Sequence, residues 1–171
     1  MKYIATSIFT LFLIAQSVAQ KSTSVSDQFT IEGLVRKTLT ITIDSLKKQA
    51  TVHLDSLVIT NHAGVKKSTL RNIKAVPIKQ FLDQAEFDVE SPKQLSELYF
   101  VFIASDGYKV VYSWNEIFNN PIGGAIYLIV ERDGLGLDKI EDRISVFSKT
   151  DDKTGRRYVK GLSKVVVKRA E

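Results

Sequence analysis

The fold is indicated most clearly by residues 98–118, which have the sequence LYFVFIASDGYKVVYSWNEIF. Its first seven residues are almost all apolar, which is typical of a strand buried on both faces. Asp106-Gly107 is a frequent hairpin turn, so Tyr108–Tyr112 is expected to return as the partner strand. Ser113 and Glu116 have the spacing of a capping box, which predicts that a short helix begins there.

Further strands are predicted where apolar or β-branched residues alternate with polar ones. The clearest examples begin at Phe29 and at Leu39, each with apolar side chains at every second position. The alternation over residues 51–60 slips near residues 55–57, where we expect a bulge. The strands predicted besides the hairpin are 29–33, 39–43, 51–60, 125–130, 144–147 and 163–168.

Two more helices are predicted, and both are short. Pro77–Ala85 has apolar residues at helical spacing, and proline suits a first helical position. Asp44 is expected to cap a helical segment over residues 45–49, because its carboxylate can accept from free backbone N–H groups. Strands outnumber helices and do not alternate with them regularly, so the predicted fold class is α+β, mostly β, in a single domain.

Composition limits the kind of protein this can be. The chain has 171 residues, of which 44% are hydrophobic and 25% charged, and it contains no cysteine. This is ordinary globular composition, and it excludes a disordered chain, a collagen-like fibre and a disulfide-stapled miniprotein. It also excludes a cysteine nucleophile and any metal centre held by thiolates.

The first residues have the pattern of a secretory signal peptide. Lys2 gives a positive start, residues 4–15 are apolar over signal length, and Ser17 and Ala19 are small residues at the cleavage-site positions. The apolar run is too short for a membrane span, so no span is expected after cleavage. We therefore expect an exported protein, periplasmic or secreted, and the lack of cysteine favours a bacterial source. The predicted parts are a signal peptide at 1–19, a flexible polar lead-in at 20–26 and one domain at 27–171.

Common catalytic motifs are missing. The sequence has no GxxxxGK phosphate loop, no full dinucleotide fingerprint and no GxSxG nucleophile elbow. His53 and His62 are the only histidines, and their spacing does not predict a shared metal. The carboxylate pairs Asp151-Asp152 and Glu141-Asp142 lie in polar loops, where we expect them to be solvated rather than to act as general acids or bases.

Positive charge is concentrated in two stretches. Residues 65–80 contain five basic residues and no acid, and residues 149–169 contain eight basic residues against two acids. If the stretches meet in space, they form an anion-attracting surface. The alternative is a solvated face that keeps the protein soluble. Nucleic acid is not an expected partner, because no base-stacking motif or reading helix accompanies the charge.

Five segments, taken in order, carry a resemblance to a known family. Their sequences are FTIEGLVRKTLTITIDSL (29–46), AVPIKQFL (75–82), FIASDGY (102–108), ISVF (144–147) and GRRYVKGLSKVVV (155–167). In this succession they resemble the oxidoreductase molybdopterin-binding domain, which has the sulfite-oxidase fold. The resemblance covers nearly all of the predicted domain. It implies a mixed-sheet, barrel-like fold with a few short helices, and a molybdopterin cofactor.

The same resemblance indicates a missing metal ligand. In the catalytic members a cysteine thiolate holds molybdenum, in the segment between the first short helix and the helix that follows the V-P pair. The matching stretch here, residues 57–64 (LVITNHAG), has no cysteine. Because a soft thiolate is what that metal site uses, oxygen-atom transfer at a cysteine-held molybdenum is not expected.

The resemblance also implies where a binding cleft would lie. It would be formed by the residues around Asn61, the 66–71 loop, the turn at Asp106 and the pair Arg156-Arg157. Arginine pairs bidentately with phosphate, which a pterin cofactor carries. Since adjacent side chains on an extended chain point in opposite directions, at most one of the two arginines is expected to face the cleft. The candidate binding residues are Asn61, His62, Lys67, Arg71, Asp106, Tyr108, Arg156 and Arg157.

Three hypotheses about function follow from the sequence. The first is an exported, non-catalytic domain that binds a pterin cofactor or another small anionic ligand through its basic loops. The second is a molybdenum-pterin oxidoreductase whose metal has no cysteine ligand. The third is a protein-interaction domain that kept the fold and lost the pocket. The sequence does not identify a partner protein.

Overall fold

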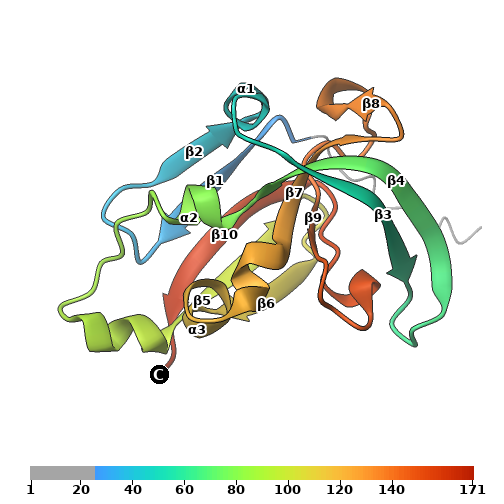
Figure 1. Cartoon of the computed structure of the whole chain (residues 1–171). Coiled ribbons are helices and arrows are strands. Elements are labelled where there is room, and N and C mark those ends of the chain that lie inside the picture. The colour runs from blue at the N-terminus through green and yellow to red at the C-terminus, as the bar shows by residue number, and fades with distance from the viewer. Residues whose placement is uncertain (1–25) are drawn as a thin grey trace, which may run out of the picture.

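The computed structural model describes residues 26–171 as two five-stranded sheets with short helices at their ends (Figure 1). The strand order of the first sheet is β2-β1-β10-β5-β6, and that of the second is β3-β4-β7-β8, with β9 also paired to β7. The first sheet consists of β1 (Gln28–Gly33), β2 (Leu39–Thr42), β5 (Leu98–Ala104), β6 (Lys109–Ser113) and β10 (Leu162–Arg169). The second consists of β3 (Val52–Thr60), β4 (Lys66–Pro77), β7 (Ile126–Arg132), β8 (Leu135–Gly136) and β9 (Val146–Ser148).

Seven short helical segments connect these strands. The α-helices are α1 (Ile43–Lys47), α2 (Lys79–Leu82) and α3 (Trp114–Phe118). The 3-10 segments are η1 (Pro92–Glu97), η2 (Pro121–Ala125), η3 (Leu137–Lys139) and η4 (Thr154–Arg156). None of the helices within residues 26–171 is long and apolar enough to cross a membrane. The predicted fold class, α+β and mostly β, is confirmed.

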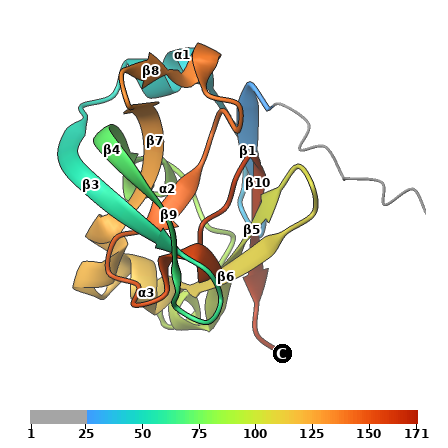
Figure 2. The ribbon, with the colours of Figure 1, turned by 90° about the vertical axis from the view of Figure 1, so that its right-hand side faces the viewer.

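The main hydrophobic core lies where the two sheets face each other (Figure 2). Phe29, Phe102 and Val165 contribute from the first sheet, and Val76 and Leu128 from the second. A smaller cluster that includes Ile73, Ala75 and Phe147 packs on the other side of the second sheet. Each large side chain buried in this way stabilises the fold by roughly 1.5–3 kcal/mol relative to leaving it exposed.

The hairpin predicted from residues 98–112 is confirmed, but its first strand is not buried on both faces. β5 pairs with β6 in the register Val101 to Val111, and Gly107 adopts a positive φ of 88° in the turn. The inward-facing residues of β5 are buried, whereas the alternate ones, such as Val101, are only half-buried. The reason is that β5 lies next to the edge strand β6, and only one face of this sheet packs on the core.

The structure corrects the details of two helices and confirms a third. The N-cap of α1 is Thr42 rather than Asp44, because the Thr42 hydroxyl accepts from the backbone N–H of Ser45 at 3.2 Å. The helix predicted from Pro77 is shortened to Lys79–Leu82, since β4 continues through Pro77. The capping box that starts α3 is present as predicted.

The largest error of the sequence analysis concerns residues 66–71, which were expected to form a loop. They belong to the twelve-residue strand β4, which pairs with β3 in a long curved hairpin (Figure 1). Asn72 has a positive φ of 47°, and this irregularity breaks the apolar alternation that would have predicted a strand. The bulge expected at 55–57 is also misplaced, because the register between β3 and β4 shifts between Ile59 and Thr60.

The predicted signal peptide at 1–19 lies outside the described residues, as does most of the lead-in at 20–26. Both therefore remain predictions. The described chain begins just before the predicted start of the domain at residue 27, and β1 begins at Gln28.

Candidate functional site

Arg156 connects two hairpins that are far apart in the sequence. Its Nε and Nη2 donate to the backbone oxygen of His62, at 3.2 and 3.0 Å, at the tip of the β3–β4 hairpin. Its own backbone oxygen accepts from the Tyr108 hydroxyl at 2.5 Å, at the turn of the β5–β6 hairpin. The structure therefore brings together three of the eight candidate residues, His62, Tyr108 and Arg156.

Two further candidates shape these turns. The side-chain oxygen Oδ1 of Asn61 accepts from the backbone N–H groups of Ala63 and Val65 at 3.0 and 2.9 Å. Asp106 Oδ1 accepts from the backbone N–H of Tyr108 at 2.8 Å. Both side chains act as turn-stabilising acceptors, which is a common role of Asn and Asp.

Lys67 and Arg71 lie on β4 instead of a loop, and both are exposed. Arg71 is paired across the hairpin with Ser56, several residues from the hairpin tip. Neither residue lines the pocket described below.

The segment that carries Arg156 is fastened to the end of β3. The buried Thr154 hydroxyl donates to the backbone oxygen of Val58 at 2.6 Å and accepts from the backbone N–H of Thr60 at 3.1 Å. Gly155 packs so closely that a Cβ built on it would lie 1.8 Å from the Thr60 oxygen, so only glycine fits there. These contacts bring the two basic stretches of the sequence together at the hairpin tip.

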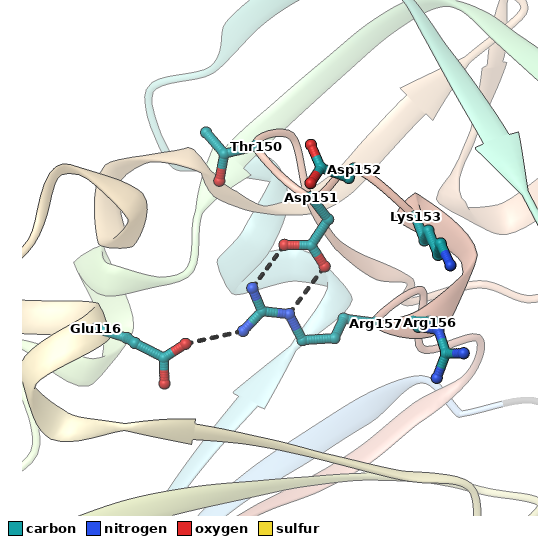
Figure 3. A pocket seen from close by; sticks show the side chains of 7 residues that line it. All are labelled: Glu116, Thr150, Asp151, Asp152, Lys153, Arg156 and Arg157. Carbon is teal, nitrogen blue, oxygen red and sulfur yellow. Dashed lines mark hydrogen bonds and ion pairs between the residues drawn. The ribbon is translucent and has the colours of Figure 1, made fainter. Parts of the chain in front are cut away.

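An open pocket of about 570 Å³ lies beside η4 and is shown in Figure 3. Its lining has three cationic side chains, three carboxylates and one hydroxyl, so it carries no net formal charge. The lining residues are Glu116, Thr150, Asp151, Asp152, Lys153, Arg156 and Arg157.

Arg157 fills the inner part of this pocket. Its Nε and Nη2 donate to the two oxygens of Asp151 at 2.8 and 2.6 Å, and its Nη1 donates to Glu116 Oε1 at 3.1 Å. The guanidinium carbon lies 4.3 Å from the ring centroid of the buried Tyr112. Lys153 and Arg156 point away from this group (Figure 3), and within residues 26–171 neither forms an ion pair with a carboxylate.

The pKa values follow from these contacts. The hydrogen bonds that Arg157 donates to Asp151 raise the pKa of Arg157, so its guanidinium is always charged. Burial raises the pKa of Glu116, but hydrogen bonds from Ser113 and Arg157 outweigh that effect and lower it below its ordinary value. Burial raises the pKa of Tyr112, which stays a neutral phenol beneath the guanidinium. The group therefore holds one cation and two carboxylates at neutral pH.

The acidic members of the pocket were not predicted as site residues. Asp152 is exposed, as expected, but the Asp151 side chain is only 11% exposed because it pairs with Arg157. Asp142, in the other carboxylate pair, is buried. Its Oδ2 lies 3.2 Å from Lys160 Nζ and 3.6 Å from Arg132 Nη2. The expectation of solvated loop acids is therefore wrong for Asp142 and Asp151, because basic side chains from other segments surround them.

The residues of this region do not fit a molybdenum-bearing pterin. The chain has no cysteine, and no cluster of His, Asp and Glu side chains among residues 26–171 has the arrangement needed to hold a metal ion. Arg157, the better buried of the two arginines that the resemblance assigns to a phosphate, is already paired with two carboxylates. We derive no chemical step that passes through such a cofactor.

Comparison with known proteins supports the fold but does not show a family. No protein-family model matches the sequence, and no curated protein matches it either. Among solved structures, the chain is similar to the sulfane dehydrogenase SoxCD from Paracoccus pantotrophus, with a TM-score of 0.59 and 13% sequence identity. The match covers 85% of this chain and 40% of that one. The chain thus shares its fold with part of that larger protein.

Proposed function

We propose that this chain is an exported, non-catalytic binding domain that receives a small anionic ligand at the junction of its two basic stretches. We call this junction the basic loop cluster, and it consists of His62, Lys66, Lys153 and Arg156. The observation that carries the proposal is the contact between η4 and the β3–β4 hairpin, through which Arg156 binds the backbone of His62.

Several features support an anion as the ligand. Lys66 is paired with Thr60, which contacts Thr154 and Gly155 on η4. An added Cβ at Gly64 would lie 3.6 Å from Lys153 Cε, so Lys153 lies along the hairpin tip. Glu116 and Asp151 in the adjoining pocket are paired with Arg157, and not with Lys153 or Arg156. Clustered cations of this kind raise the local concentration of anions.

The proposal is tested by titrating the purified full chain with inorganic pyrophosphate and measuring heat or chemical-shift changes. We expect saturable binding that the double substitution Lys153→Gln and Arg156→Gln weakens about tenfold, equivalent to roughly 1.4 kcal/mol. The matched control is Lys93→Gln with Lys168→Gln, which removes the same charge from exposed positions on η1 and β10. Its effect should be less than about twofold, because salt screens distant charges.

Lys153→Gln alone is the companion variant, since Arg156 also holds the hairpin tip in place. Equal weakening by the cluster variants and the control would reject the basic loop cluster as the binding site. No saturable binding by the unaltered chain would reject the proposed function.

The enzymatic alternative has its own measurement. Elemental analysis of protein purified from the export compartment of its host is expected to find less than about a tenth of an equivalent of molybdenum or tungsten, because no soft thiolate is present to hold it. Metal near one atom per chain, together with pterin absorbance, would instead support an oxidoreductase without a cysteine ligand.

A further inference from the structure

We propose that Asp151 and Glu116 act as a built-in anion that occupies the Arg157 site, so that no phosphate-bearing ligand is received at this arginine. This departs from the role that the sequence resemblance assigns to Arg157. It does not depend on the basic loop cluster, which uses other side chains.

The Arg157 guanidinium is already bound along the edge that would bind a phosphate. Asp151 uses both of its oxygens on the Nε and Nη2 edge of Arg157, at 2.8 and 2.6 Å. This is the same edge-on, two-bond arrangement in which arginine binds a phosphate. Asp151 therefore stands where two oxygens of a ligand would be.

Few hydrogen-bond donors of the Arg157 guanidinium remain free to bind a ligand. Of its five N–H donors, three are used by Asp151 and Glu116. One face of the guanidinium is covered by the Tyr112 ring, whose centroid is 4.3 Å away. A ligand could reach only the two remaining N–H groups, which belong to different nitrogens.

The charge of the group formed by Arg157, Asp151 and Glu116 is also unfavourable for an anion. Two carboxylates face one guanidinium, so the group as a whole is negative and repels an incoming anion. The Asp151 side chain is 11% exposed and that of Arg157 24% exposed, so solvent screens this repulsion only in part. An anion could take the Nε and Nη2 edge only by displacing Asp151 and leaving that carboxylate half-buried without its partner, which is unfavourable.

The inference has a direct consequence, which is that a single substitution should uncover a latent anion site. Asp151→Ala frees the Nε and Nη2 donors and empties the space beside them, while Glu116 and Tyr112 still hold the guanidinium in place. The matched control is Asp152→Ala, which removes the same charge from the next residue and from the same pocket without touching Arg157.

The experiment is a titration of each full-length variant with inorganic phosphate. We expect Asp151→Ala to bind phosphate at least about tenfold more tightly than Asp152→Ala, and a second substitution, Arg157→Gln, to remove that gain. Equal phosphate affinities for the two alanine variants would overturn the inference.

A measurement on the unaltered chain keeps the inference testable if Asp151→Ala fails to fold. The Nε–H resonance of Arg157 is followed by NMR while phosphate is added. We expect no shift of this resonance, even when signals from Arg156 or Lys153 move because the basic loop cluster binds phosphate. A saturable shift of the Arg157 resonance would overturn the inference, whereas a lack of movement at Arg156 and Lys153 would count only against the proposed function.

Discussion

At the scale of single residues, Thr154 holds the segment that carries Arg156 against the end of β3. Its hydroxyl satisfies two backbone groups of β3, the oxygen of Val58 and the N–H of Thr60. Because the residue is only 8% exposed, water cannot easily replace either bond. The position of Arg156 at the hairpin tip depends on this attachment.

Thr154→Val keeps the shape of the side chain and removes both hydrogen bonds. We expect it to lower the free energy of unfolding by about 1–3 kcal/mol, because two partly buried backbone groups lose their partner. Urea unfolding followed by Trp114 fluorescence measures the change. Thr38→Val, at an exposed position, is the control and should alter stability by less than about 0.5 kcal/mol. Equal effects of the two substitutions would show that the Thr154 attachment is not important.

At this scale the sequence marks Arg156 and Arg157 as candidate anion-binding residues but does not reveal their contacts within the protein. The partners of Arg157 are six and 41 positions away along the chain. Neither spacing corresponds to a repeat of regular secondary structure, so the pairing arises only when the segment after β9 folds back onto α3. Asp151 and Asp152 have the same local sequence context, and only tertiary contacts make one paired and the other exposed.

At the scale of elements, the reliable predictions were those with a local physical cause. The β5–β6 turn follows from Asp106-Gly107, and α3 begins at the capping box of Ser113 and Glu116. β4 was missed because its exposed face is rich in lysine and arginine and because Asn72 interrupts its alternation. A strand of this kind is stabilised by pairing with β3 and β7, which no local pattern reveals.

Two glutamates make the stability of these elements depend on pH. Glu116 caps α3, and its pKa is lowered. Glu32 on β1 contacts Lys164 on β10, and hydrogen bonds donated by Thr30 and Lys164 lower the pKa of Glu32. Both folded-state pKa values lie below the ordinary 4.5. The stabilisation that each ionised glutamate contributes is therefore fully present above pH 4.5, and it is lost as the pH falls through the pKa of the folded state.

We therefore expect the urea concentration at the unfolding midpoint to decrease as the pH is lowered below about 4.5. The double variant Glu32→Gln and Glu116→Gln should show a shallower fall over the same interval. Identical slopes for the variant and the unaltered chain would mean that other carboxylates cause the acid sensitivity.

At the scale of the whole molecule, the first sheet depends on the last strand of the chain. β10 is the middle of its five strands, with β1 on one side and β5 on the other. Its residues Val165 and Val167 are buried in the core. The order of segments predicted the strands of this sheet, but no local pattern predicts that the final strand lies at its centre, because pairing between distant segments has no local signal.

Ending the chain at Gly161 should therefore abolish the fold rather than trim it. We expect the shortened protein to lose its cooperative unfolding transition, since the pairs β2-β1 and β5-β6 would be separated by an empty position. Circular dichroism during heating measures this. A chain that ends at Arg169 is the control and should unfold like the full protein, because it lacks only two exposed residues after β10.

The central position of β10 also sets the time at which the protein can fold. Glu32 and Lys164 are 132 residues apart in the sequence but form an ion pair across neighbouring parallel strands. The contact forms only after the whole segment from β1 to β10 has been synthesised, so the first sheet cannot close before β10 is available. Contacts of such long range also slow folding. Until β10 is in place, β1 and β5 each have an unpaired edge, because β10 is the strand that joins them.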